Sequence, residues 1–116
     1  MIDDITIEAF NTRFTVDLSN YRKLTAAQRD QAKKYGSDAE ALLKNRELAL
    51  FIHHHKFDIA DGLTMITGHS ADDNARRVAL SNQLSGVDAF VASLKRAVIM
   101  KNKIIEWEQR PPEMNQ

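Results

Sequence analysis

Three consecutive histidines, His53 to His55, are the first side chains in this sequence that could bind a metal ion. Consecutive helical side chains point about 100° apart, so the three imidazoles do not share one ion. Only His54 has carboxylates at helical spacing, and such nitrogen and oxygen ligands suit a divalent cation. The candidate ligand set is Glu47, His54, Asp58 and Asp61. No HExxH or paired ExxH motif accompanies it, so we favour a polar helix face with His54 hydrogen-bonded to Asp58, and we expect no cofactor.

A second group combines basic residues with Met and Trp at steps of four, three, four and three. Its members are Arg96, Met100, Lys103, Trp107 and Arg110. Cations interleaved with stacking groups can bind a nucleic acid strand. Trp and Arg also dominate many protein–protein interfaces. A third interpretation is that Met100 and Trp107 widen the buried stripe while the cations reach solvent.

The sequence offers no recognisable catalytic set. It has no Cys, no nucleophile elbow, no phosphate-binding glycine loop and no carboxylate pair with a distinctive spacing. Its 16 basic and 16 acidic residues cancel, so no overall field attracts nucleic acid or anionic lipid. The first residues do not resemble a signal peptide, and no apolar run is long enough to cross a membrane. We therefore expect a soluble, cytoplasmic protein that is not an enzyme.

The element that must position these residues is a long C-terminal helix. Apolar side chains recur there at alternating steps of four and three, and Lys101 is the one polar member of the series. The apolar members are Leu80, Leu84, Val87, Val91, Leu94, Val98 and Ile105. This spacing predicts a heptad seam on one helix face, which must be covered by the rest of the chain or by a second copy.

The boundaries of the helices are predicted from capping signals. Ser70 and Asp73 start the last helix, and we favour its continuation through Gly86 to residue 109, before Pro111 and Pro112. A break at Gly86, with Ser85 capping a separate last helix, is the alternative. The preceding helix is predicted over residues 38–67, from a capping box at Ser37 to a stop at Gly68, so that a two- or three-residue connection forms an antiparallel hairpin.

Two shorter helices are predicted before the hairpin. The first covers residues 4–21, where Ile7, Phe10, Phe14, Leu18 and Tyr21 recur at helical spacing. The second begins with a capping box between Thr25 and Gln28 and ends at Gly36, the residue type favoured at helix C-termini.

These patterns together predict an all-α single domain over residues 1–116. Residues 1–36 would form the N-terminal helices, 37–110 the helical hairpin and 111–116 a frayed tail. We expect a protein–protein interaction module that binds a protein partner or pairs with itself as a homodimer, through the seam or the Arg96 to Arg110 stripe. A small nucleic-acid-binding accessory protein is the alternative, and a metal-binding helical protein around His54 and Asp58 is the second alternative.

Overall fold

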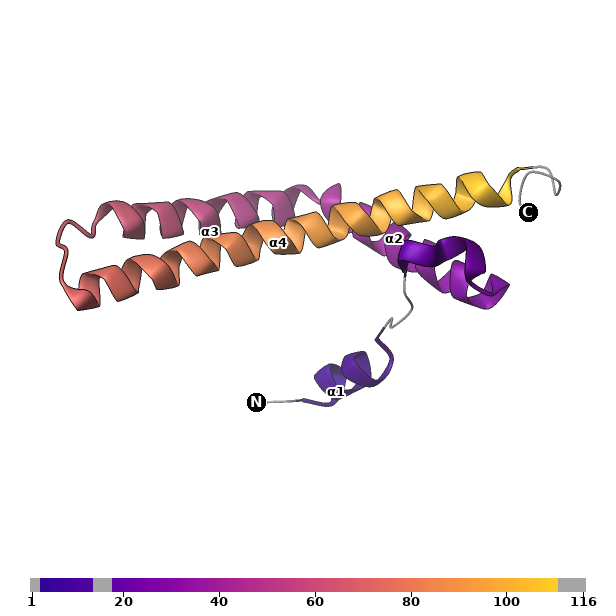
Figure 1. The fold of residues 1–116 in the computed structure, drawn as a ribbon, viewed down its shortest axis with the longest axis horizontal. Helices are drawn as coiled ribbons and strands as arrows, with labels where there is room; N and C mark the ends of the chain where they lie inside the picture. Colours follow the sequence, from indigo (N-terminus) through magenta and orange to yellow (C-terminus); the bar gives the residue numbers. More distant parts are fainter. Residues whose placement is uncertain (1–2, 14–17, 111–116) are drawn as a thin grey trace.

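The computed structural model describes residues 3–13 and 18–110, and every regular element in these ranges is helical. The elements are α1 (Asp4–Asn11), a 3-10 helix η1 (Leu18–Lys23), α2 (Ala26–Leu43), α3 (Arg46–Thr64) and α4 (Ala71–Glu108). Figure 1 shows α4 as a rod along most of the molecule, with α3 beside one half and α2 crossing the other. The prediction of an all-α fold built around a long C-terminal helix is confirmed.

The helix α4 runs unbroken through Gly86, as its apolar spacing predicts. Its N-terminus is closed by a capping box in which the Ser70 hydroxyl accepts from the Asp73 backbone N–H and the Asp73 carboxylate accepts from the Ser70 N–H. The same arrangement between Thr25 and Gln28 opens α2. Both capping boxes agree with the sequence prediction, because they depend only on residues three positions apart.

The predicted boundary at Gly36 is wrong, because α2 continues through this residue to Leu43. Gly36 is buried against α4, where an added Cβ would overlap Lys101 and lie 2.7 Å from the carbonyl oxygen of Ala97. The glycine therefore permits close helix packing and does not terminate the helix. Ser37, the predicted N-cap, is an exposed residue inside α2.

The single helix predicted over residues 38–67 is instead divided between α2 and α3. The break lies at Lys44, the C-cap of α2, and Asn45, whose extended backbone begins α3. The Asn45 side chain accepts a hydrogen bond of 2.7 Å from the backbone N–H of Leu48. An N-cap at Asn45 is thus favoured over helix continuation.

The connection between α3 and α4 is longer than predicted, since α3 ends at Thr64 and not at Gly68. Ile66 is buried outside any helix, and the Arg77 guanidinium donates to the carbonyl oxygens of Ile66 and Gly68. The hairpin is still antiparallel. Tertiary burial and one arginine organise the turn, and neither is visible as a local sequence signal.

The predicted helix over residues 4–21 is shorter in the structure, because α1 ends at Asn11. The Thr12 hydroxyl donates to the carbonyl oxygen of Glu8 at this end, which offers the backbone an alternative to another helical turn. Ile7 and Phe10 are exposed, and η1 begins a separate element at Leu18. Phe14 and the predicted frayed tail over residues 111–116 lie outside the described residues.

The core of the described chain lies mainly between α2 and α4. Both helices place small side chains at their crossing, and Ala39, Leu94 and Ala97 form a buried cluster that Leu43 and Val98 extend. Near the C-terminal end of α4, Ile104 is completely buried. Small residues let two helix backbones approach closely, so this half of the molecule is densely packed.

Candidate functional site

The predicted heptad seam lies at the interface of α4 with the two helices antiparallel to it. Leu94 is buried, and the other six apolar members are half-buried. Leu80, Val87 and Val91 line hollows shared with α3, whereas Val98 packs on the α2–α4 cluster. Lys101 is covered by α2, where its ammonium group is ion-paired with Glu40. The seam is therefore covered within the chain, but incompletely beside α3.

Two fully buried residues of α4 lie beside the predicted seam. Ala97 and Ile104 face α2, and sequence reasoning passed over both. The positions are three and ten residues after Leu94, so they fall on the flank that α2 covers. The signal that could have identified them is the series of small residues Ala32, Gly36 and Ala39, whose spacing predicts a close helix contact.

The structure divides the predicted stripe from Arg96 to Arg110. Arg96 and Lys103 are exposed, and Met100 is half-buried. The Trp107 ring is contacted by the guanidinium of Arg29 on α2, 5.1 Å from the ring centroid, and Arg110 is ion-paired with Glu106 at 3.5 Å. The only aromatic member of the stripe is thus engaged inside the molecule.

Three side chains at the α2–α4 contact have shifted pKa values: Lys33, Glu40 and Glu108. The carboxylate of Glu108 on α4 is ion-paired with the Lys33 ammonium nitrogen at 2.7 Å and with the Arg29 Nε at 2.8 Å. Hydrogen bonds from these two cations lower the pKa of the Glu108 carboxyl. The hydrogen bond to Glu108 in turn raises the pKa of Lys33. Hydrogen bonds from Lys101 and Lys44 lower the pKa of Glu40 from 4.5 to about 2. These charges fasten the two helices together.

The predicted metal ligands lie on the exposed surface of α3. Glu47, His54, Asp58 and Asp61 are all exposed. Within residues 3–13 and 18–110, no three His, Asp or Glu side chains gather in an arrangement that could hold a metal ion. The candidate set is therefore not assembled, and we do not carry the metal-binding alternative further.

A groove that sequence reasoning missed lies where α2, α3 and α4 meet. It encloses about 470 Å³. Its floor is mainly apolar, with side chains from all three helices: Leu42, Leu43, Leu48, Ala49, Ile52, Val91, Ala92 and Leu94. Polar side chains form its rim: His53, Lys56, Asp88 and Lys95.

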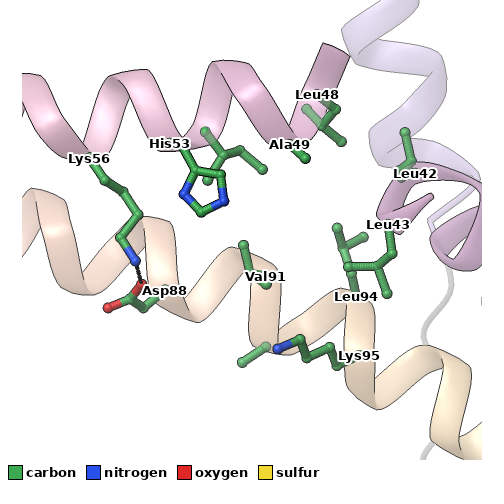
Figure 2. Close-up of a pocket in the computed structure, with 12 residues that line it drawn as sticks. Leu42, Leu43, Leu48, Ala49, His53, Lys56, Asp88, Val91, Leu94 and Lys95 are labelled. Atoms are coloured by element: carbon green, nitrogen blue, oxygen red, sulfur yellow. Dashed lines mark hydrogen bonds and ion pairs between the residues drawn. The ribbon is translucent and has the colours of Figure 1, made fainter. Parts of the chain in front are cut away.

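Figure 2 shows Lys56 reaching from α3 to Asp88 on α4, with His53 projecting between the two helices. The ammonium nitrogen of Lys56 lies 2.9 Å from a carboxylate oxygen of Asp88. Lys95 lies farther along α4 and makes no ion pair within the described residues. The rim therefore carries one balanced ion pair and one additional positive charge.

The groove exists because the break at Asn45 sends α3 away from the direction of α2. Beside α2, alanine and glycine bring the helices together, whereas beside α3 larger residues such as Leu48 and Ile52 stand between the backbones. Residues that are far apart in the sequence determine the shape of the groove, and no local sequence motif indicates it.

None of the helices in the described residues combines the length and the apolar character that a membrane crossing requires. The chain matches no protein-family model, no curated protein and no solved structure.

Proposed function

We propose that this protein is a non-enzymatic interaction module whose groove binds an apolar helical segment of a partner protein. The observation that carries the proposal is an open, mainly apolar groove bounded by three helices, with Lys95 at its rim. Such a surface matches the recognition mode in which an amphipathic helix lays its apolar face into a hydrophobic groove.

The floor of the groove supplies the driving force for this binding. Leu42 remains 44% exposed although it lines the groove together with the half-buried Leu48 and Val91. Covering apolar surface contributes about 25 cal/mol per Å². A partner helix that covers these side chains therefore gains affinity without any change in the fold of the module.

The rim defines the chemistry of the partner. Lys56 is already paired with Asp88, which leaves Lys95 as the unbalanced charge, and two like charges at an interface repel each other. The partner helix should therefore carry a carboxylate beside its apolar face. We place the module in the cytoplasm, because a chain without Cys suits a reducing compartment.

Binding of a nucleic acid through the Arg96 to Arg110 stripe is the alternative. It is less well supported, because the Trp107 ring already contacts Arg29 and the net charge of the chain is zero. Arg96, Met100 and Lys103 stay candidates for a partner contact. Lys95 and Lys103 lie on the same helix, so a charge reversal at each separates the two hypotheses.

The test is photo-crosslinking in a lysate of the native source. A diazirine amino acid at Ala49 lies in the groove, and the same group at Ala89, an exposed residue of α4 outside it, is the control. We expect one protein to be captured from position 49 through a peptide that combines apolar and acidic residues. Lys95→Glu should abolish this crosslink, and Lys103→Glu should leave it.

Two results would overturn the proposal. Equal crosslinking from Ala49 and Ala89 would remove the groove as the site. A complex that survives Lys95→Glu, but is lost with Lys103→Glu and after nuclease treatment, would instead establish nucleic acid binding through the stripe. Salt dependence would then be steep, because each phosphate contact releases counterions.

A further inference from the structure

The molecule exposes more surface than a compact chain of its size. Its accessible surface is 8840 Å², whereas a folded monomer of 13.2 kDa exposes about 6,400 Å². Its radius of gyration is 19.5 Å, against about 13 Å expected for a compact domain of this length. Part of the excess belongs to α1, which has no buried residue. Among the described residues, no further helix covers the α3–α4 hairpin in Figure 1, and several of its large apolar side chains are exposed.

One face of this hairpin, away from the groove, is mainly apolar, although the exposed Asp58 lies on it between Phe51 and Met65 at steps of seven residues. On α3 it includes Phe51, which is 73% exposed, and Met65, which is 78% exposed; on α4 it includes Phe90, which is 46% exposed. Hollows of about 540 and 360 Å³ lie along it. Among the residues that α4 contributes to these hollows, Ala79, Gln83, Gly86 and Phe90 follow steps of four, three and four, so they share one side of the helix. We name this surface the Gly86 face.

The scarcity of charged side chains in the two hollows of the Gly86 face favours a second copy of the chain as the molecule that covers it. A two-fold interface brings each residue near its own copy or its symmetry mate, so a surface with few charges suits pairing with itself. The larger hollow has no Asp, Glu, Lys or Arg in its lining, and the smaller one has only Arg76. The groove with Lys56, Asp88 and Lys95 is the opposite case, because its charges favour a different partner.

Shape supports the same occupant. An added Cβ at Gly86 would meet no atom within 4 Å, so an empty position lies beside the projecting rings of Phe51 and Phe90. Projecting aromatic rings and a glycine hollow on one surface can fit each other across a two-fold axis. A typical stable interface takes about 800 Å² from each partner, and the exposed rings of Phe51 and Phe90 together with Met65 offer apolar surface for one.

We propose that two copies of this chain pair through the Gly86 face, so that two α3–α4 hairpins form an antiparallel four-helix bundle. The inference rests on the proposed function as an interaction module and assigns a second copy to the face opposite the groove. Each subunit then keeps its groove open for the partner helix. The protein becomes a two-fold symmetric adaptor with two binding grooves.

The test is the substitution Gly86→Lys, measured by light scattering coupled to size exclusion at several concentrations. Lysine is a better helix former than glycine, and its Cβ would meet no atom within 4 Å, so the subunit should stay folded. We expect the native protein to have twice the 13.2 kDa chain mass and the variant to have the chain mass. Circular dichroism should show equal helix content. Ile99→Lys places the same charge at an exposed apolar position outside this face, and should keep the dimer.

A native protein that is monomeric at every concentration would overturn the inference. So would a Gly86→Lys variant that keeps the doubled mass, or an Ile99→Lys variant that loses it. The crosslink from Ala49 distinguishes these failures from failure of the proposed function. If the crosslink persists in a monomeric protein, the groove binds a partner without dimerisation; if it is absent from a dimer, only the Gly86 face is functional.

Discussion

The two halves of α4 form different kinds of interface. Its C-terminal half meets α2 through small residues, and the helices are close enough that Gly36 has no room for a methyl group. Its N-terminal half meets α3 through Leu, Ile and Val, and leaves hollows on two faces. The comparison teaches that the size of side chains at the contact decides whether two helices close completely or keep surface for a partner.

The ion pairs between helices also differ between the two halves of α4. In the α2–α4 half, Glu108 binds two cations of α2, and Glu40 binds Lys101 across the helices. In the α3–α4 half, the Lys56–Asp88 pair is the one ion pair between the helices among the described residues. Several ion pairs therefore join α4 to α2, whereas a single ion pair joins it to α3 among the described residues.

The largest effect is expected from Ile104→Ala, which tests whether the α2–α4 half holds the fold. Ile104 is completely buried, so truncation should lower the free energy of unfolding by about 2–5 kcal/mol. Ile99→Ala, at an exposed position of the same helix, should change it by less than about 0.5 kcal/mol. Urea denaturation followed by circular dichroism measures both, and equal losses would contradict the comparison.

Substitutions of two glycines by alanine should change the free energy of unfolding in opposite directions. Gly36→Ala forces α2 away from α4 and should destabilise the protein by about 1–3 kcal/mol, because the added methyl group overlaps the Cβ of Lys101 and the carbonyl oxygen of Ala97. Gly86→Ala adds a Cβ that meets no atom of its own subunit, and should stabilise α4 of the monomer by up to about 1 kcal/mol. Thermal melts measure both changes in stability. They should be recorded at a concentration where both variants have the same oligomeric state. A stabilising Gly36→Ala would show that the halves do not differ in packing.

Removal of the N-cap that divides the two halves should have a smaller effect. Asn45→Ala loses the hydrogen bond to the Leu48 N–H, and should cost about 1 kcal/mol. Ser37→Ala is the control, because Ser37 lies inside α2 and caps no helix. Chemical denaturation at neutral pH measures both changes. If the Ser37 variant lost as much stability as the Asn45 variant, the break would lie at the position predicted from sequence.

The smallest effect is expected from acid. Because Lys101 and Lys44 hold the pKa of Glu40 near 2, below its ordinary value of 4.5, this carboxyl binds protons less readily in the folded chain. Its contribution to stability is therefore complete above about pH 4.5 and is lost as the pH falls towards 2. Glu40→Gln should flatten the decrease in melting temperature over this range, whereas Glu47→Gln at an exposed site should not. A Glu40→Gln profile that parallels the native one would contradict this.

The sequence predicted the helical class and the long α4 well, because both depend on interactions between residues three or four positions apart. The seam from Leu80 to Ile105 and the capping boxes at Thr25 and Ser70 belong to this kind of information. The predicted helix end at Gly36 was wrong, because a glycine that ends a helix and a glycine that lets a neighbouring helix approach cannot be told apart in a single sequence. The groove was missed for a related reason, since its lining residues lie on three helices.

By itself, then, the sequence determined that this chain forms amphipathic helices and where α4 begins and ends, because hydrogen bonding and apolar periodicity act locally along the chain. Only the tertiary structure decided that Gly36 lies against Lys101, that Asn45 divides the hairpin, and that Trp107 is contacted by Arg29. These features depend on which helices meet and how closely, and side-chain volumes at distant positions set that distance.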